Sequence, residues 1–467
     1  MPVLGKRSIR RLGCGSAIIA VVSWLFTETL RAETLVDTLV RVYQNNSQLN
    51  AQRAQLRATD ENVPQALSGY RPQVSAGLSA GLTGVKNGLP NGGTESATLR
   101  PRMAGVTITQ PLFNGFRTGN AVRQAEAQVR SGREALRNVE QTVFVNAVTA
   151  YMNIVADQAL IEAQRSNVTF LRETLDSTRR SLEAGNLTTT DVAQAEARHY
   201  RGLADLNAAE VSLAVDRATY TQVVGSTPGR LAPADSPERT LPRSREEAIT
   251  IARREHPTIV AATYDVDSAQ AAVKVAEAAL LANVNVQGSA SRSIETDTTL
   301  TVTRTDQASA TVQATVPIYD GGMAASQVRQ AKEMLAQNRL TLDQVRLQTD
   351  TAVATVWATH EGARISMNAA EAEVRAAIAA LSGVQQEHQA GQRTTLDVLN
   401  SQQDLIGARA RLIQAQRDLV VTGYTLLGAL GRLDHKLLGL PTVDYEPQSH
   451  YFQVRDAWHG LRTPSGQ

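Results

Sequence analysis

A long internal repeat constrains the fold of this chain more than any other feature of its sequence. Gln-Pro-Leu-Phe-Asn-Gly at positions 110–115 returns as Val-Pro-Ile-Tyr-Asp-Gly at positions 316–321, an offset of 206 residues. The same offset relates Gly185 to Gly391 and Gly225 to Gly431. Two copies of about 200 residues are far longer than the units of a solenoid, so the chain contains a duplicated domain.

The alignment of the two copies changes upstream of the proline pair, where Val74 matches Val284 at an offset of 210 residues. Four additional residues of the first copy must therefore lie between Val74 and Pro111. Chain length varies most easily in exposed loops. We therefore expect an exposed loop in this part of the first copy.

Each copy is expected to contain a helix, two strands joined by a loop, and two helices joined by a turn. In the first copy, helix formers extend from Leu35 to about Tyr70, and apolar residues alternate with Ser, Gly and Thr over 74–83. That alternation is typical of a strand with one apolar and one polar face. The Gly-rich residues 84–96 are predicted to form a loop, and residues 106–109 a return strand.

The second copy repeats this order, with a strand at Val284 and Val286, a polar loop over 289–306 and a strand over 308–316. Four strands cannot bury both of their faces inside so small a sheet. An apolar face opposite a face of Ser, Gly and Thr suits a wall between lipid and water.

Long helices follow the two proline-containing corners. Small and apolar residues recur in the first of them at alternating spacings of four and three, which is a heptad seam that lets neighbouring helices lie close. Its members are Ala125, Val129, Gly132, Leu136, Val139 and Val143. Residues 117–184 would extend roughly 100 Å, whereas 187–224 and 35–70 would each extend about 55 Å. Stacked end to end, the two shorter helices would match the long one, as in the wall of a hollow cylinder.

The N-terminus has the pattern of a secretory signal. Basic residues precede an apolar stretch from Ala17 to Phe26, which is about half the length needed to span a bilayer, and cleavage is expected after Ala32. The single cysteine, Cys14, precedes the apolar stretch, so a lipid anchor is not expected. We expect a signal peptide over 1–32, a first repeat over 33–230, a Pro-rich linker over 231–243, a second repeat over 244–432, and a tail over 433–467 that packs around the middle of the helices or is disordered.

Composition and motifs exclude several classes of function. The formal net charge is +2 with both signs interspersed, so no nucleic-acid partner is expected. No mature segment is apolar enough for a transmembrane helix, so a membrane location would require a barrel. Gly77-Leu78-Ser79-Ala80-Gly81 matches a nucleophile elbow but lies inside an alternating strand. The seven histidines are scattered, and solvent-exposed positions are expected for them. We therefore predict no catalytic residue, metal site or cofactor.

With these features the chain resembles the TolC family of outer-membrane efflux and type I secretion channels. The resemblance covers about residues 33–431 and rests on the two corners and on two turn segments at 184–192 and 390–400. It implies a mainly α fold with a membrane β-barrel, in which a homotrimer closes a twelve-stranded barrel continued by a long α-helical periplasmic tunnel. The corner residues are Pro111, Gly115, Pro317 and Gly321.

The resemblance also implies a location and partners. The location is the outer membrane of a Gram-negative bacterium, in contact with its lipid and extending into the periplasm. The partners are a periplasmic adaptor (membrane fusion) protein and an inner-membrane ABC or proton-driven exporter. The alternative function from the residues is a periplasmic coiled-coil adaptor, which also has long helical hairpins. An adaptor should have one hairpin, whereas the sequence of this chain predicts two hairpins and two amphipathic strand pairs.

In the family, the tips of the helical hairpins form a closed periplasmic entrance. By motif position, Asp397 would be a carboxylate of the constriction, Arg393 a linking residue, and His388 would replace an aromatic linker. Asn400 occupies a second acidic position, and Asp191 would be a bonding partner across the tip.

A simpler interpretation of the same segments is structural. Ser, Thr and Asp are favoured at helix N-termini, and glycine at helix C-termini. By this interpretation the two aspartates belong to N-terminal caps and the glycines end the preceding helices. The tip residues concerned are Gly185, Gly391, Thr188, Thr189, Thr394 and Thr395.

Overall fold

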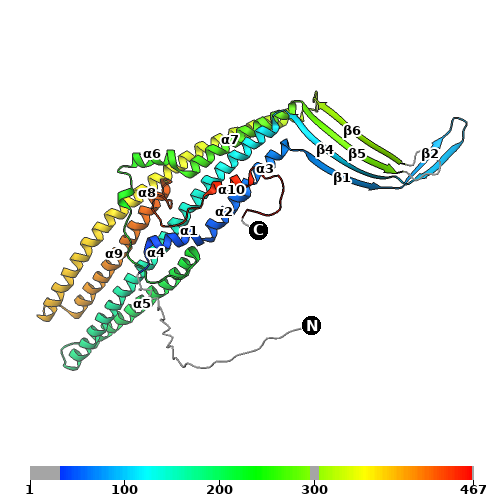
Figure 1. The fold of residues 1–467 in the computed structure, drawn as a ribbon. Coiled ribbons are helices and arrows are strands. Elements are labelled where there is room, and N and C mark those ends of the chain that lie inside the picture. The colour runs from blue at the N-terminus through cyan, green and yellow to red at the C-terminus, as the bar shows by residue number, and fades with distance from the viewer. Residues whose placement is uncertain (1–31, 295–303, 465–467) are drawn as a thin grey trace, which may run out of the picture.

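The computed structural model describes residues 32–294 and 304–464. Expectations for residues 1–31, including most of the signal peptide and Cys14, and for 295–303 lie outside the described residues. The molecule is elongated, with a curved sheet at one end and long helices that extend away from it (Figure 1). Within the described ranges, none of the helices carries an apolar stretch long enough to cross a lipid bilayer.

The two repeats form matching sets of helices. The first contains α1 (Leu35–Asn45), α2 (Ser47–Asp60), α3 (Asn62–Leu67), α4 (Arg117–Glu183) and α5 (Thr189–Val224). The second contains α6 (Arg245–Glu255), α7 (Pro257–Glu277), α8 (Met323–Gln389) and α9 (Thr395–Ala429), and the tail contains α10 (Pro447–Val454).

The helix expected from Leu35 to Tyr70 is interrupted at Asn46. The backbone of Asn46 is extended, and its side-chain oxygen accepts a hydrogen bond from the N–H of Leu49 at 3.0 Å, which caps α2. His256 has the same role before α7, where its Nδ1 accepts from the N–H of Thr258 at 3.3 Å. Both copies are therefore broken at matching positions by a polar cap rather than by a glycine.

The two long helices, α4 and α8, contain 67 residues each, as the sequence predicts. One part of α4 packs against α1, α2 and α3 and another part against α5, so the expected stacking of shorter helices beside the long one is confirmed. The heptad seam lies in this contact, because a Cβ added to Gly132 would be 3.2 Å from Cδ1 of Leu56. A small residue is therefore needed where the helices are closest.

Laterally, the helices form one layer with two free edges. Near the hairpin tips the order of neighbouring helices is α5, α4, α9 and α8. Nearer the sheet α7 takes the place of α9, between α4 and α8. The edges are α8 on one side and α5 with α1 on the other, and both edges expose large apolar side chains. These are Tyr200, Leu203, Val211 and Val215 on α5, and Met334, Leu340, Leu347, Ile365 and Ile378 on α8.

The sheet joins the two repeats. Its strands are β1 (Gln73–Ala80), β4 (Arg102–Asn114), β5 (Asn283–Ile294) and β6 (Arg304–Thr315), antiparallel in the order β1-β4-β5-β6. Val74 pairs with Ile108, and Val286 with Val312, whereas Ser289 pairs with Ser309. Since neighbouring residues on a strand face opposite sides, the predicted division into an apolar and a polar face is confirmed.

Two predicted loops are partly strand. Residues 84–96 were expected to be a loop, but they lie largely in a separate hairpin of β2 (Thr83–Gly88) and β3 (Thr94–Leu99). The turn closes where the backbone of Gly92 has φ +81°, and the N–H of Leu89 donates to the carbonyl of Gly93 at 2.8 Å. The polar loop expected over 289–306 is also too long, because both its ends pair in β5 and β6.

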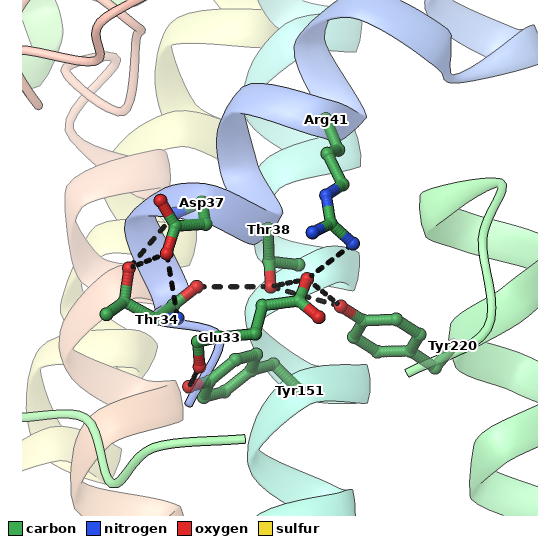
Figure 2. Close-up of polar contacts among 7 residues, drawn as sticks. All are labelled: Glu33, Thr34, Asp37, Thr38, Arg41, Tyr151 and Tyr220. Atoms are coloured by element: carbon green, nitrogen blue, oxygen red, sulfur yellow. Dashed lines mark hydrogen bonds and ion pairs between the residues drawn. The ribbon is translucent and has the colours of Figure 1, made fainter. Parts of the chain in front are cut away.

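At the middle of the helices, residue Glu33 joins three segments that are distant in sequence. Its backbone N–H donates to the carbonyl of Arg230 at 2.8 Å, and its carbonyl accepts from the N–H of Ala232 at 2.9 Å, which ties it to the start of the linker between the repeats. Its carboxylate accepts from Tyr220 at 2.8 Å and pairs with Arg41 at 3.1 Å (Figure 2). Its carbonyl accepts from the Tyr151 hydroxyl of α4 at 2.9 Å. A buried carboxylate with this many donors is well compensated.

The tail packs along α1, α2 and α4 rather than away from them. Leu433 and Leu440 are buried in the main core, and the N–H of Tyr445 donates to the Tyr43 hydroxyl at 3.0 Å. His435 and His450 contribute two further attachments, to Glu140 and Asp60. Nδ1 of His435 lies 2.7 Å from Glu140, and Nδ1 of His450 lies 2.9 Å from Asp60.

The expectation of solvent-exposed histidines is wrong for His360, which is buried on α8, and for these two residues of the tail. Their side chains are only 11% and 12% exposed, because each packs between the tail and a helix and bonds to a buried carboxylate. Scattered positions in the sequence gave no sign of carboxylate partners about 300 to 400 residues away.

The His435 attachment predicts a pH dependence. The hydrogen bond to Glu140 raises the pKa of His435 above its ordinary value. Its contribution to stability is therefore fully present below the unfolded pKa of about 6.5 and is lost as the pH rises through the folded pKa. Protease cleavage of the tail should be severalfold faster at pH 9 than at pH 6.5, and the protein with His435→Gln should lose this dependence. His459→Gln, at an exposed position, is the control and should keep it.

Candidate functional site at the hairpin tips

The two helical hairpins end in turns of matching geometry at the end of the molecule opposite the sheet (Figure 1). Gly185 and Gly391 end the preceding long helices with φ of +78° and +76°, a left-handed conformation that glycine adopts without strain. The structural interpretation of these glycines is thus confirmed. Thr188 and Thr394 then begin α5 and α9 as extended N-cap residues.

Asp191 and Asp397 complete reciprocal capping boxes in these turns. The carboxylate of Asp397 accepts from the N–H and hydroxyl of Thr394 at 3.0 and 2.8 Å, and its own N–H donates to that hydroxyl oxygen at 3.2 Å. Asp191 makes the same three bonds with Thr188, at 2.9, 2.7 and 3.3 Å. Within one chain, Asp191 therefore bonds inside its own helix rather than across the tip.

The capping bonds also fix the charge of both aspartates. Hydrogen bonds from the backbone and side chain of Thr188 hold the pKa of Asp191 below its ordinary value, and those from Thr394 do the same for the pKa of Asp397. Both carboxylates are therefore ionised at neutral pH, and each presents a partly exposed negative charge at the tip. A cap and a negative charge at an entrance are thus compatible roles for the same side chain.

Arg393 and His388 connect the second turn to the end of α8. Nε of Arg393 donates to Glu387 Oε2 at 2.8 Å, and this hydrogen bond raises the pKa of Arg393. Nδ1 of His388 lies 2.9 Å from the carbonyl oxygen of Arg393, so that ring nitrogen carries the proton. The sequence analysis named Arg393 and His388 but missed Glu387, the carboxylate that holds the guanidinium.

Asn400 links the two hairpins. Its Oδ1 accepts from Nη2 of Arg198 on α5 at 2.9 Å, and two residues further along α9 Gln402 donates to Asn167 of α4 at 2.8 Å. Sequence reasoning missed Arg198, although it stands seven residues after Asp191 and so lies on the same helix face two turns later. Where the resemblance expects a second acid, this chain has an amide that serves as an acceptor between hairpins.

A cavity of about 360 Å³ separates the hairpins just above the turns. It is lined by Phe170 and Glu173 of α4, by His388, and by Thr395 of α9. Thr395 is buried and its hydroxyl has no hydrogen-bond partner in the described chain, whereas Thr189, the equivalent residue of the first turn, is exposed. The two tips are therefore not equivalent, and the second turn packs more closely against its neighbour.

The corners at the other end of the long helices differ between the repeats. Pro111 lies inside β4, at a register shift that extends to Phe113, because proline has no N–H for the ladder. Pro317 lies beyond the end of β6. Gly115 and Gly321 both have positive φ, +62° and +70°. Only Gly115 is enclosed, since a Cβ there would be 2.7 Å from Cβ of Leu281.

The tips bring together charged and polar groups but no catalytic arrangement. In the described ranges, His, Cys, Asp and Glu side chains do not gather in threes as a metal site would require. The tip of one chain presents ionised carboxylates and an arginine that is paired with Glu387. Such a surface can repel or attract ions in a narrow passage, and it can form or break polar links with another copy.

Comparison with known proteins identifies a family and several relatives to which this chain is similar. The model of the family described as outer membrane efflux protein matches residues 38–226 and 248–432. The outer membrane efflux protein BepC of Brucella suis biovar 1 (strain 1330) is 41% identical over 453 residues, which cover 97% of each chain. The outer membrane protein TolC of Escherichia coli (strain K12) is 24% identical over 442 residues, 91% of this chain and 87% of TolC.

Solved structures share the fold. The Campylobacter jejuni CmeC outer membrane channel superposes with a TM-score of 0.77 at 13% identity, over 97% of this chain and 98% of CmeC. The Neisseria gonorrhoeae MtrE outer membrane channel, in its open state, superposes with a TM-score of 0.67 at 18% identity, over 86% of this chain and 90% of MtrE.

Proposed function

This chain belongs to the outer membrane efflux protein family, and from that premise we propose that three copies assemble into one continuous duct. The chain is an outer-membrane channel of the efflux and type I secretion class and not an enzyme. In the proposed assembly, the four strands of each copy contribute to a closed barrel in the membrane, and the helices form a tunnel in the periplasm.

The observation that carries the proposal is that the sheet and the helical layer of one chain each have two unpartnered edges, and that these edges lie on the same two sides of the chain. Among residues 32–294 and 304–464, the outer edges of β1 and β6 have no strand partner, and the helical layer ends in α5 with α1 on one side and α8 on the other. An unpaired strand edge and an exposed apolar helix edge both call for partners. Because the two edges differ, copies must join head to tail, and such contacts form a ring when the rotation between neighbouring copies closes.

The sheet has the dimensions and faces for a bilayer. Strands β4, β5 and β6 contain 13, 12 and 12 residues, and about 9 to 11 tilted residues cross the hydrocarbon core. Val74 and Leu78 are 66% and 88% exposed on the apolar face of one chain. Contact of this face with lipid and of the Ser- and Thr-rich face with water would satisfy both.

The hairpin tips are proposed to form the periplasmic entrance. Three copies would bring three Asp397 carboxylates around the axis, while Asn400 adds no charge, so the ring would attract cations weakly. Arg393, His388 and Asp191 would supply the polar links that hold the tips together. The domain boundaries at 33–230, 231–243, 244–432 and 433–467 are proposed on the same premise.

Partners follow from the class of channel. Channels of this type work with inner-membrane exporters and periplasmic adaptors, and we assign this chain an adaptor and an ABC or proton-driven exporter. One relative, AprF of Pseudomonas aeruginosa, is an alkaline protease secretion protein and is 25% identical over 347 residues, and another, BepC, is an efflux protein. We therefore propose that the cargo of this chain is secreted protein, small compounds or both.

Mass and conductance of the purified mature protein test the assembly. We expect light scattering in detergent to give three times the mass of one chain, and the same material to form pores in planar bilayers. Val215→Glu, which adds a charge to the α5 edge, should reduce trimers at least tenfold. Val443→Glu, at an 87% exposed tail position, is the matched control and should leave them intact. A folded, monomeric protein that forms no pore would favour the adaptor function instead.

A further inference from the structure

A cationic pocket lies away from the tips, between the tail and the helices of the first repeat. Its volume is about 180 Å³, and it is lined by residues of α1, α2, α4 and the tail. Four Arg and Lys side chains line it: Arg53, Arg133, Arg137 and Lys436. Arg137 is paired with Glu134 at 2.7 Å and Lys436 with Asp444 at 3.6 Å. Arg53 and Arg133 have no such partner among the described residues, and two unpaired cations in a partly enclosed space favour an anion.

Arg53 is the deepest of these charges and is only 8% exposed. Its guanidinium lies between two aromatic rings, 4.5 Å from the centre of Tyr43 and 4.9 Å from that of Tyr445. One nitrogen, Nη1, donates to Asn50 at 2.9 Å, but Nε has no hydrogen-bond partner among the described residues. The two rings compensate part of the charge and also fix the plane of the guanidinium.

No carboxylate of the described chain lies within 4.0 Å of either Arg53 or Arg133 as an ion-pair partner. Nε of Arg133 is likewise buried without a hydrogen-bond partner. A buried charge without an ion-pair partner, such as Arg53, is costly, and nearly all such groups in proteins are paired. Arg133 is only partly buried and has the carboxylate of Asp60 as a more distant counter-charge.

The two acidic residues that line the pocket are already occupied. Oε1 of Glu140 accepts from both the backbone N–H and Nδ1 of His435, at 2.9 and 2.7 Å. Oδ1 of Asp434 accepts from the N–H of Leu437 at 2.7 Å. Neither carboxylate can therefore move to Arg53 without losing these bonds.

We propose that this pocket binds a small oxyanion, either a carboxylate or a phosphate, through the guanidinium groups of Arg53 and Arg133, which line it. Guanidinium groups present their donors in the planar geometry that such oxyanions accept. A volume of about 180 Å³ accommodates a group of this size but not a large ligand.

Anion binding would also hold the tail in place. The pocket has one wall on α2 and α4 and another on the tail, where His435 and Tyr445 lie. An anion between the two walls would bind Arg53 and Arg133 on the helices. It would also neutralise their positive charge, which faces the tail across the pocket. Occupancy should therefore slow protease cleavage of the tail as well as raise thermal stability.

Titration of the purified mature trimer with sodium phosphate and with sodium acetate, each at ionic strength fixed with chloride, tests the proposal. Calorimetry should show saturable heat, and the unfolding midpoint should rise by roughly 2–4 °C at ten times Kd. Arg53→Met should abolish both effects. Arg165→Gln, an exposed arginine on α4 paired with Glu210, is the matched control and should retain them.

Phosphate stabilises many proteins without a site, so comparison of the variants decides. An equal rise in midpoint in wild type and Arg53→Met, or no saturable heat in wild type, would overturn the proposal. Binding of phosphate alone or acetate alone would identify which oxyanion the pocket takes. If Arg53→Met does not yield folded protein, Arg133→Gln replaces it. Its affinity is expected to fall about tenfold, and unchanged affinity would likewise refute the site.

Discussion

Replacing Gly115 by alanine is expected to remove nearly all folded channel from the outer membrane. At φ +62° an alanine is strained by about 1 kcal/mol or more, and its Cβ would lie 2.7 Å from Cβ of Leu281 and 2.8 Å from the carbonyl oxygen of Ala278. The second contact is with backbone that also leads into β5. Strain and overlap together should cost roughly 3–5 kcal/mol, a large part of the stability of a typical domain.

Its repeat mate supplies the control for this prediction. Gly321 has nearly the same φ, +70°, but a Cβ there would have no neighbour within 4 Å in the described chain. Gly321→Ala should therefore cost only the backbone strain of about 1 kcal/mol and leave most of the protein folded. Immunoblots of outer-membrane fractions and thermal unfolding of the purified proteins measure both. Equal loss in the two variants would show that overlap at Gly115 is not the cause.

The second large effect is expected in conductance. The wild-type pore should have a small resting conductance, and Arg393→Ser should raise it severalfold because the guanidinium no longer holds the second turn. The ion pair to Glu387 is solvent-exposed, so its loss should change stability little. Single-channel recording in planar bilayers therefore measures the entrance and not the fold.

Asp397→Ala should reduce cation selectivity in the same recordings, because the charge at the proposed constriction disappears. This substitution also removes a capping box and so weakens the start of α9. Asp397→Asn is the matched variant, since its amide oxygen can still accept the capping bonds from Thr394 while the charge is gone. Reduced selectivity in both variants would assign the effect to the charge, and reduced selectivity in Asp397→Ala alone would assign it to helix capping. Unchanged selectivity in both would place the constriction elsewhere.

The parts of the fold that sequence reasoning predicts correctly depend on local chemistry. Glycine at positive φ ends the long helices at Gly185 and Gly391, and period-two alternation marks β1. Duplication strengthens each of these inferences, because an independent copy repeats it. The break at Asn46 was missed because an asparagine within a run of helix formers is a weak local signal.

The contacts that were missed are between residues distant in the sequence. Arg198 meets Asn400, and His435 meets Glu140, only because separate helices pack together. No spacing rule within one segment identifies such pairs. The hairpin of β2 and β3 was missed for another reason: glycine and proline mark the turn, but they also conceal the short strands on either side of it.

The position of Glu33 has a consequence for how the precursor is processed. Cleavage is expected after Ala32, which would make Glu33 the first residue of the mature chain, and its carboxylate and backbone hold α1, α4, α5 and the linker together (Figure 2). A signal peptidase that cut one bond later would remove this residue, and with it the contacts that join α1, α4, α5 and the start of the linker. If cleavage falls where it is expected, the accuracy of a single proteolytic event during export therefore affects the stability of the finished channel.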